Sequence, residues 1–150
     1  MNIGAGIYTV TITDINGCEN VEQVTLTEPD VLAQSMVVSN INCFGVYDGM
    51  IDLTVTGGVM PYTYVWSNTA VFEDLVQLGP GTYAVTVTDA NGCQVMGSAT
   101  LTEPTELASS AMVTHTGCSN DNTGEIDLTV LGGTTPYSFL WSNGDTTEDL

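Results

Sequence analysis

The chain has 150 residues, of which 18 are acidic, one is histidine and none is lysine or arginine, so its formal net charge is −18. Without cationic side chains it cannot neutralise nucleic acid phosphates, clamp a phosphate with arginine, form a lysine Schiff base or present a basic patch to an anionic membrane. Chains that are disordered because of their charge have a low hydrophobic content, whereas 43% of this chain is hydrophobic. A folded protein is therefore predicted.

The predicted elements of the chain are short β-strands. For the stretch between the first and the second Glu-Pro motif, alternation of apolar and polar residues predicts strands at 32–41, 50–56, 62–67, 82–89 and 93–102, with a shorter strand or turn near 71–78. Gly57-Gly58 ends one strand, and Asn91-Gly92 predicts a type I′ hairpin turn. Six or seven short strands predict an immunoglobulin-like β-sandwich. Its expected core consists of Ile51, Leu53, Val55, Trp66, Tyr83, Val85 and Val87.

The chain also repeats itself. Residues i and i+75 are identical in 36 of 75 pairs, without a gap. An ungapped period of this length predicts tandem 75-residue immunoglobulin-like sandwiches rather than a solenoid. If each unit ends at its Glu-Pro motif, residues 1–29 are the C-terminal part of a preceding repeat, 30–104 are one complete repeat, and 105–150 are the N-terminal part of a following repeat. We therefore expect the chain to be a window from a longer array.

The four cysteines are Cys18, Cys43, Cys93 and Cys118, and the last two repeat the first two at i+75. Bonds between equivalent positions could not repeat along an array, which leaves a short link, from Cys18 to Cys43 and from Cys93 to Cys118, or a longer link between Cys43 and Cys93. Turn chemistry at Glu28-Pro29-Asp30 favours a hairpin that places Cys18 opposite Cys43, and equally Cys93 opposite Cys118. If the chain runs onward there, the bonds could instead join neighbouring units. Because the chain has no Cys-x-x-Cys and a single histidine, disulfides and an oxidising, extracellular location are predicted rather than zinc.

A motif string runs from Gly57 to Cys93: Gly-Gly-x-x-Pro-Tyr-x-Tyr-x-Trp-Ser-Asn, then Glu-Asp-Leu, then Gly-Thr-Tyr-x-Val-Thr-Val-Thr-Asp-x-Asn-Gly-Cys. It begins again at Gly132, and its second half is present at 6–18. This string resembles the SprB repeat of giant surface adhesins in gliding Bacteroidota, which the type IX secretion system exports. The resemblance implies a long extracellular filament that touches the substratum, and it implies no enzyme activity.

Acidic side chains and the lone histidine are the candidates for chemistry. A Ser-His-Asp set can be assembled only around His115, and the recurring pairs Glu73-Asp74 and Glu148-Asp149 are typical of turns, so we predict no enzyme and no catalytic residue. Calcium is the one cofactor considered, because carboxylates are its preferred ligands, and diffuse cation screening is the alternative. The candidate calcium ligands are Asp48, Asp52, Asp121, Glu125 and Asp127.

The resemblance, together with the repeated acidic β-units, thus implies a structural segment of a long extracellular adhesin filament that serves cell-surface adhesion and gliding motility. Expected partners are neighbouring repeats, the substratum or a surface polysaccharide, and other filaments of the same kind; neither nucleic acid nor membrane insertion is expected. Two alternatives stay open. One is a self-assembling extracellular filament subunit whose half-units are completed by neighbouring chains. The other is a secreted carbohydrate-binding module, in which Tyr47 would stack on a sugar ring.

Overall fold

The computed structural model describes residues 2–119 and 122–150, and within them it contains ten β-strands and no helix. The predicted all-β class is therefore confirmed. No helix in the described part is long and apolar enough to cross a membrane. The strands are β1 (Gly6–Thr13), β2 (Glu19–Leu26), β3 (Ala33–Ser39), β4 (Gly49–Thr56), β5 (Thr63–Trp66), β6 (Leu75–Leu78), β7 (Gly81–Thr88), β8 (Gln94–Leu101), β9 (Ala108–Thr114) and β10 (Glu125–Leu131).

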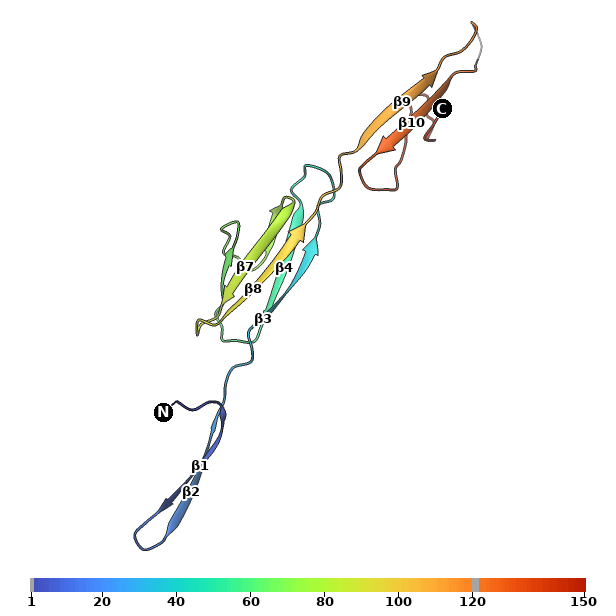
Figure 1. Cartoon of the computed structure of the whole chain (residues 1–150). Helices are drawn as coiled ribbons and strands as arrows, with labels where there is room; N and C mark the ends of the chain where they lie inside the picture. The colour runs from blue at the N-terminus through green and yellow to red at the C-terminus, as the bar shows by residue number, and fades with distance from the viewer. Residues whose placement is uncertain (1, 120–121) are drawn as a thin grey trace.

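The strands form three bodies that follow one another along an elongated molecule (Figure 1). The β1–β2 hairpin lies at one end and the β9–β10 hairpin, with the loops that follow it, at the other. Between them, two three-stranded antiparallel sheets, in the orders β3-β4-β6 and β5-β7-β8, face each other as a β-sandwich. Its immunoglobulin-like character stays a prediction.

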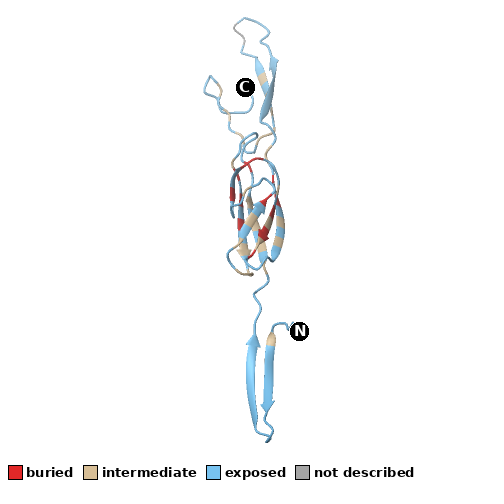
Figure 2. Cartoon of the chain, turned by 90° about the vertical axis from the view of Figure 1, so that its left-hand side faces the viewer, coloured by how far each residue is buried: buried red, intermediate tan, exposed pale blue. Residues whose placement is uncertain are grey.

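The central sandwich holds the buried core. Alternation turns every second side chain of each strand inward, so apolar residues of both sheets meet between the layers. The buried apolar residues are Ile41, Ile51, Leu53, Trp66, Leu75, Leu78, Val85, Val87, Ala99 and Leu101. Val55 and Tyr83 of the predicted core pack at its margin and are partly buried. The whole core lies within the predicted range 30–104, and buried residues gather in this part of the chain (Figure 2).

The turn between β7 and β8 differs from the prediction. Asn91 has no positive φ, as a type I′ turn would require, and only Gly92 does, at 83°. The N–H of Gly92 donates to the carbonyl of Asp89 at 3.0 Å, which closes a type I turn followed by a left-handed glycine. The predicted type I′ turn is wrong because the Asp89 carboxylate accepts the N–H groups of Asn91 and Cys93, at 2.9 and 2.8 Å, and stabilises the type I form.

The two end bodies repeat the local structure of the central one. Gly6 pairs with Leu26 in β1–β2 as Gly81 pairs with Leu101 in β7–β8. The β9–β10 pairing likewise follows the β3–β4 register, one period later in the chain. Side-chain hydrogen bonds recur too. The indole Nε1 of Trp66 donates to the carbonyl of Phe72, and that of Trp141 donates to the carbonyl of Thr147, both at 2.9 Å. The same local sequence therefore folds the same way with or without an opposing sheet.

Candidate functional site: the joints between units and the open sheet faces

Two linkers, 27–32 and 102–107, carry the chain from one body to the next. β2 and β3 do not pair; β2 pairs with β1 and β3 with β4. The predicted fold-back at Pro29 is therefore wrong, and the chain runs onward through both linkers (Figure 1). The physical reason is that each strand next to a linker is already paired within its own body.

Each linker is held by the Gly-Gly bend of the body that it leads into. The N–H of Gly58 donates to the carbonyl of Asp30 at 2.8 Å, and the N–H of Gly133 donates to the carbonyl of Thr105 at 2.9 Å. Gly57 has a φ of 70°, and a Cβ there would lie 2.0 Å from the carbonyl oxygen of Val31. Glycine is therefore required at this position, both for the left-handed backbone and for the close approach of the linker.

The second linker is also held by the body that it leaves. The carboxylate of Glu103 accepts the N–H of Gly45 at 2.8 Å, in the loop after β3. Beside it, the N–H of Ile41 donates to the carbonyl of Thr102 at 3.1 Å, and the N–H of Thr102 donates to Asn40 Oδ1 at 2.9 Å. The stretch 102–105 is thus hydrogen-bonded to both bodies. Sequence reasoning used the Glu-Pro motif as a boundary and missed this role, although its recurrence was the available signal.

Asp89 organises the end of the sandwich that faces the first linker. It is the one charged residue among those described that is fully buried, and its Oδ2 accepts the N–H of Val59 at 3.0 Å. Burial acts to raise the pKa of Asp89, but hydrogen bonds from backbone N–H groups, that of Cys93 first, outweigh it and lower the pKa. Asp89 therefore ties the loop after β4 to the β7–β8 turn as an ionised carboxylate.

The four cysteines are exposed and unpaired. Cys18 precedes β2 and Cys43 follows β3, and both strands run in the same direction along the molecule (Figure 1). The extended residues of these two strands alone separate the cysteines by roughly 50 Å, whereas a disulfide needs Cα atoms within about 7 Å. The same applies to Cys93 and Cys118 across β8 and β9. The structure brings neither predicted pair together, so both pairings lose their geometric support.

The candidate calcium ligands do not form a cluster in the described part of the chain, where no three acidic, histidine or cysteine side chains are grouped for a metal. Asp121 lies outside the described residues. Asp48 accepts hydrogen bonds from the side chain and the backbone N–H of Asn42, at 2.7 and 3.1 Å, and these lower the pKa of its carboxyl group. The side chains of Asp52, Glu125 and Asp127 are exposed. Calcium binding stays a prediction.

The acidic pairs after the tryptophans have a structural role. Asp74 Oδ1 accepts the N–H of Leu53, and Asp149 Oδ1 accepts the N–H of Leu128, both at 2.9 Å. Asp74 thus ties the loop before β6 to β4, and Asp149 ties the corresponding loop to β10. His115 is exposed. This arrangement agrees with the interpretation of both acidic pairs as turn residues.

The aromatic residues considered for sugar binding have different surroundings. Trp66 is buried in the core, as expected, and Tyr62 is partly buried with its hydroxyl donating to the carbonyl of Gly57. Tyr47 is exposed, and its ring lies against Gly79, where a Cβ would come within 2.7 Å of the ring. The Tyr47 ring therefore lies beside the backbone at Gly79 and leaves no room for a side chain there.

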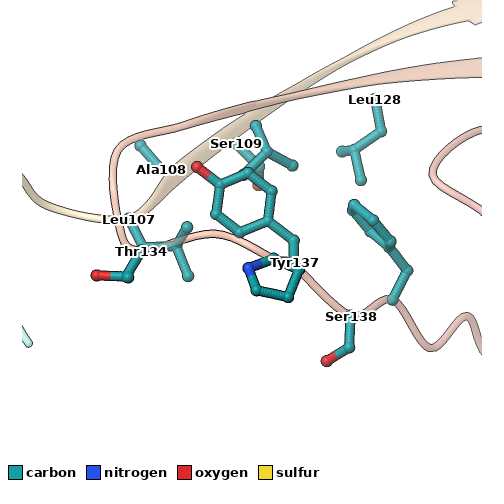
Figure 3. Close-up of a pocket in the computed structure, with 10 residues that line it drawn as sticks. Leu107, Ala108, Ser109, Leu128, Thr134, Tyr137 and Ser138 are labelled. Carbon is teal, nitrogen blue, oxygen red and sulfur yellow. The ribbon is translucent and has the colours of Figure 1, made fainter.

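Both end bodies expose the sheet faces that are buried in the central sandwich. Val10 is 50% exposed and Leu26 is 41% exposed, whereas their counterparts Val85 and Leu101 are each 1% exposed. At the other end, a groove of about 510 Å³ lies between β9, β10 and the loop after β10. Leu128 and Tyr137 project into it (Figure 3). The corresponding space of the central sandwich is filled by side chains of β7 and β8.

The comparison with protein families gives one match. The SprB repeat family matches residues 35–71 and 113–146. The first segment begins in β3 and the second in β9, and both include the Pro-Tyr and Trp-Ser-Asn elements of their copy. No curated protein and no solved structure matches the chain. The resemblance expected from the motif string is confirmed in both of these segments.

Proposed function

We propose that this chain is a structural segment of a long extracellular adhesin filament on the cell surface, which serves adhesion and gliding motility. The SprB repeat match supports a repeat segment of a cell-surface adhesin. In this proposal the units provide length and tensile strength, and no catalytic role is assigned to them. Their partners are the neighbouring repeats and the surface that the filament touches.

The observation that carries the proposal is the way in which the chain passes through the central sandwich. It arrives through β3 and leaves through β8, two strands that pack against each other and run in the same direction (Figure 1). Tension on the two linkers would therefore pull β3 and β8 past each other along their length. Their packing and the Ile41–Thr102 hydrogen bond would be sheared together rather than opened one after another. Such a unit transmits tension along the filament.

The charge of the chain fits a long and soluble filament. Each 75-residue period has nine acidic residues and no lysine or arginine, so negative charge increases in proportion to length. Like charges on successive units repel one another, which favours extension and opposes bundling, and salt weakens this effect.

The test uses an antiserum raised against the 150-residue chain on the cells that produce it. We expect labelling of intact cells that is lost after brief treatment with an external protease, and beads coated with the antibody should move along gliding cells. Labelling only after permeabilisation would overturn the extracellular location. Surface labelling with immobile beads would retain the adhesin and reject the role in gliding.

A further inference from the structure

We propose that a disulfide bond crosses each joint between two successive repeats of this kind, from the cysteine in the loop after the first strand of one repeat to the cysteine in the last hairpin turn of the next. The loop cysteines are Cys43 and Cys118, which follow β3 and β9. The turn cysteines are Cys18 and Cys93, which lie between β1 and β2 and between β7 and β8. The inference rests on the proposed function, because it requires repeats that follow one another in one chain.

The loop cysteine and the turn cysteine of one repeat cannot pair with each other. Cys43 follows β3, and Cys93 directly precedes β8. These strands run in the same direction (Figure 1), so the eight residues of β8 alone separate the two cysteines by roughly 25 Å. A disulfide needs Cα atoms within about 7 Å of each other. The longer link, from Cys43 to Cys93, is therefore not available inside the central sandwich.

The loop cysteine lies beside the linker that leaves its repeat. Cys43 begins a turn in which its carbonyl accepts the N–H of Val46 at 3.3 Å. In the same turn, the N–H of Gly45 donates to Glu103 of the second linker at 2.8 Å. The Cα atoms of Cys43 and Gly45 are at most about 7 Å apart, because only two peptide units join them. Cys43 is thus held close to the Glu-Pro motif of this joint.

The turn cysteine lies beside the linker that leads into its repeat. Glu28 of the first linker and Cys93 line the same open cavity, which has a volume of about 340 Å³. The backbone of Cys93 is fixed there, since its N–H donates to the Asp89 carboxylate at 2.8 Å and its carbonyl accepts the N–H of Asp89 at 2.9 Å. Asp14 holds Cys18 by the same two hydrogen bonds. The position of the turn cysteine is therefore a local property of each repeat.

The two joints together give the pairing. Glu28 and Glu103 occupy equivalent positions of successive linkers, one period apart. At one of them the structure places the loop cysteine of the preceding repeat, and at the other the turn cysteine of the following repeat. A joint with whole repeats on both sides thus brings one cysteine of each kind to the same glutamate.

The recurrence of the loop cysteine supports this assignment. The five residues after it differ at every position between the two copies, 44–48 and 119–123, whereas the cysteine itself is kept. The loop can therefore change its length of side chain and its polarity without losing the thiol. This is expected if the thiol bonds to a residue whose own position is fixed in every repeat.

The bond forms by thiol–disulfide exchange with an external disulfide, either a small molecule or a thiol oxidoreductase. The thiolate of one cysteine attacks the external disulfide and releases one thiol, and the second cysteine then attacks the mixed disulfide and releases the other. The two protein thiols thus lose two protons and two electrons, which reduce the external disulfide to two thiols. All four cysteines of the chain are exposed and can react. The bond would carry tension past the linker.

A head-to-tail fusion of two 150-residue chains tests the proposal, because the repeat continues in register from residue 150 of the first copy to residue 1 of the second. The reduced fusion is oxidised with glutathione disulfide at high dilution, and its monomer is cleaved with a protease specific for acidic residues. We expect two disulfides, from Cys43 and Cys118 of the first copy to Cys18 and Cys93 of the second. The single 150-residue chain should form none within the monomer.

Matched substitutions distinguish this link from a bond within each copy. Cys43→Ser in the first copy should abolish the fragment that joins Cys43 to Cys18, whereas Cys43→Ser in the second copy should leave it in full yield. The second variant also shows that the substitution does not prevent folding. If the two variants give the same yield, or if the single chain forms the link, the bond does not cross the joint and the proposal fails.

A fusion that keeps all its thiols under these conditions would also overturn the proposal. The outcome is independent of the test of the proposed function, which measures surface labelling and movement of beads on cells. Loss of surface labelling would reject the adhesin and leave a mapped disulfide standing. Absence of the disulfide would reject only the covalent joint.

Discussion

The β1–β2 and β7–β8 hairpins have equivalent sequences, the same strand register and the same pattern of turn hydrogen bonds, but different surroundings. Asp14 accepts the N–H of Cys18 at 2.8 Å, as Asp89 accepts that of Cys93. The inward side chains of β7–β8 are buried under the facing sheet, whereas those of β1–β2 are exposed. Turn and register are thus local properties, and the core is a property of two layers.

This difference has an energetic consequence. An isolated two-stranded hairpin is at best marginally stable in water, because it pays the entropy of ordering without burying an apolar face. The central sandwich buries the inward faces of its two sheets against each other and should unfold as a unit. Substitutions at equivalent positions of the two hairpins therefore test whether the facing sheet is the source of stability.

The largest contrast is expected for the leucine pair. Leu101→Ala should lower the free energy of unfolding of the central sandwich by about 2–5 kcal/mol, because it leaves a cavity in a packed core. Leu26→Ala should change it by less than about 0.5 kcal/mol. The measurement is denaturant unfolding followed by tryptophan fluorescence, at concentrations where the chain is monomeric. Equal effects would mean that the two hairpins share one cooperative core.

The next contrast concerns the Gly97 position. Gly97→Glu should destabilise the central sandwich by about 1–3 kcal/mol, because the ends of the Gln34 and Met36 side chains must move aside for its Cβ and the rest of the side chain adds further bulk between the sheets. Glu22→Gly should leave the central transition unchanged. Adding Gln34→Ser and Met36→Ala to Gly97→Glu should recover part of the loss. If the triple variant is no more stable than Gly97→Glu, the steric account is wrong.

A smaller effect is expected at the turn carboxylates. In Asp89→Asn, the amide NH2 group would face either the N–H of Val59 or those of Asn91 and Cys93, so a buried hydrogen bond is lost and the melting temperature should fall. In Asp14→Asn the amide oxygen can still accept both turn N–H groups. The matched variant should therefore have little effect on the central transition.

The pH dependence of the Asp89 effect follows from its lowered pKa. A carboxyl group whose pKa is lower in the folded state stabilises the fold above its unfolded pKa, about 3.9, and loses this contribution as the pH falls through the folded value. The difference in melting temperature between wild type and Asp89→Asn should thus be largest at neutral pH and shrink below about pH 4. A difference that grows on acidification would reject this role.

The smallest effect is expected at the joint. Glu103→Ala removes the hydrogen bond to Gly45, which should cost at most about 1.5 kcal/mol of stability. Its main consequence should be a looser second joint, visible as a broader distribution of distances in small-angle scattering. Glu28→Ala at the equivalent position of the first linker is the control. If both variants scatter alike, Glu103 does not stiffen the joint.

Several features of the fold could be predicted from local patterns. The strands follow the alternation of apolar and polar residues, and observed bounds such as Ala33–Ser39 and Gly49–Thr56 fall within two residues of those expected. Trp66 and its neighbours were recognisable as core because they occupy alternate positions of strands whose ends are marked by turn residues. The resemblance to the SprB repeat was recognisable because its motifs keep the same order and spacing where they recur.

Other features depended on long-range contacts. The pairing of Cys18 with Cys43 lost its support because β2 and β3 each pair elsewhere. The type I′ turn was wrong for a local reason, since the carboxylate of Asp89 accepts the N–H groups of Asn91 and Cys93 within the turn. The role of Glu103 depends on a residue 58 positions away.

The sequence by itself determined most of the strands and the 75-residue recurrence, because alternation and turn chemistry act over a few neighbouring residues. Only the tertiary structure decided which residues form the core and why Gly57 must be glycine. The reason is that burial and steric fit depend on the residues that a second sheet or a linker brings close, and these lie far away in the chain.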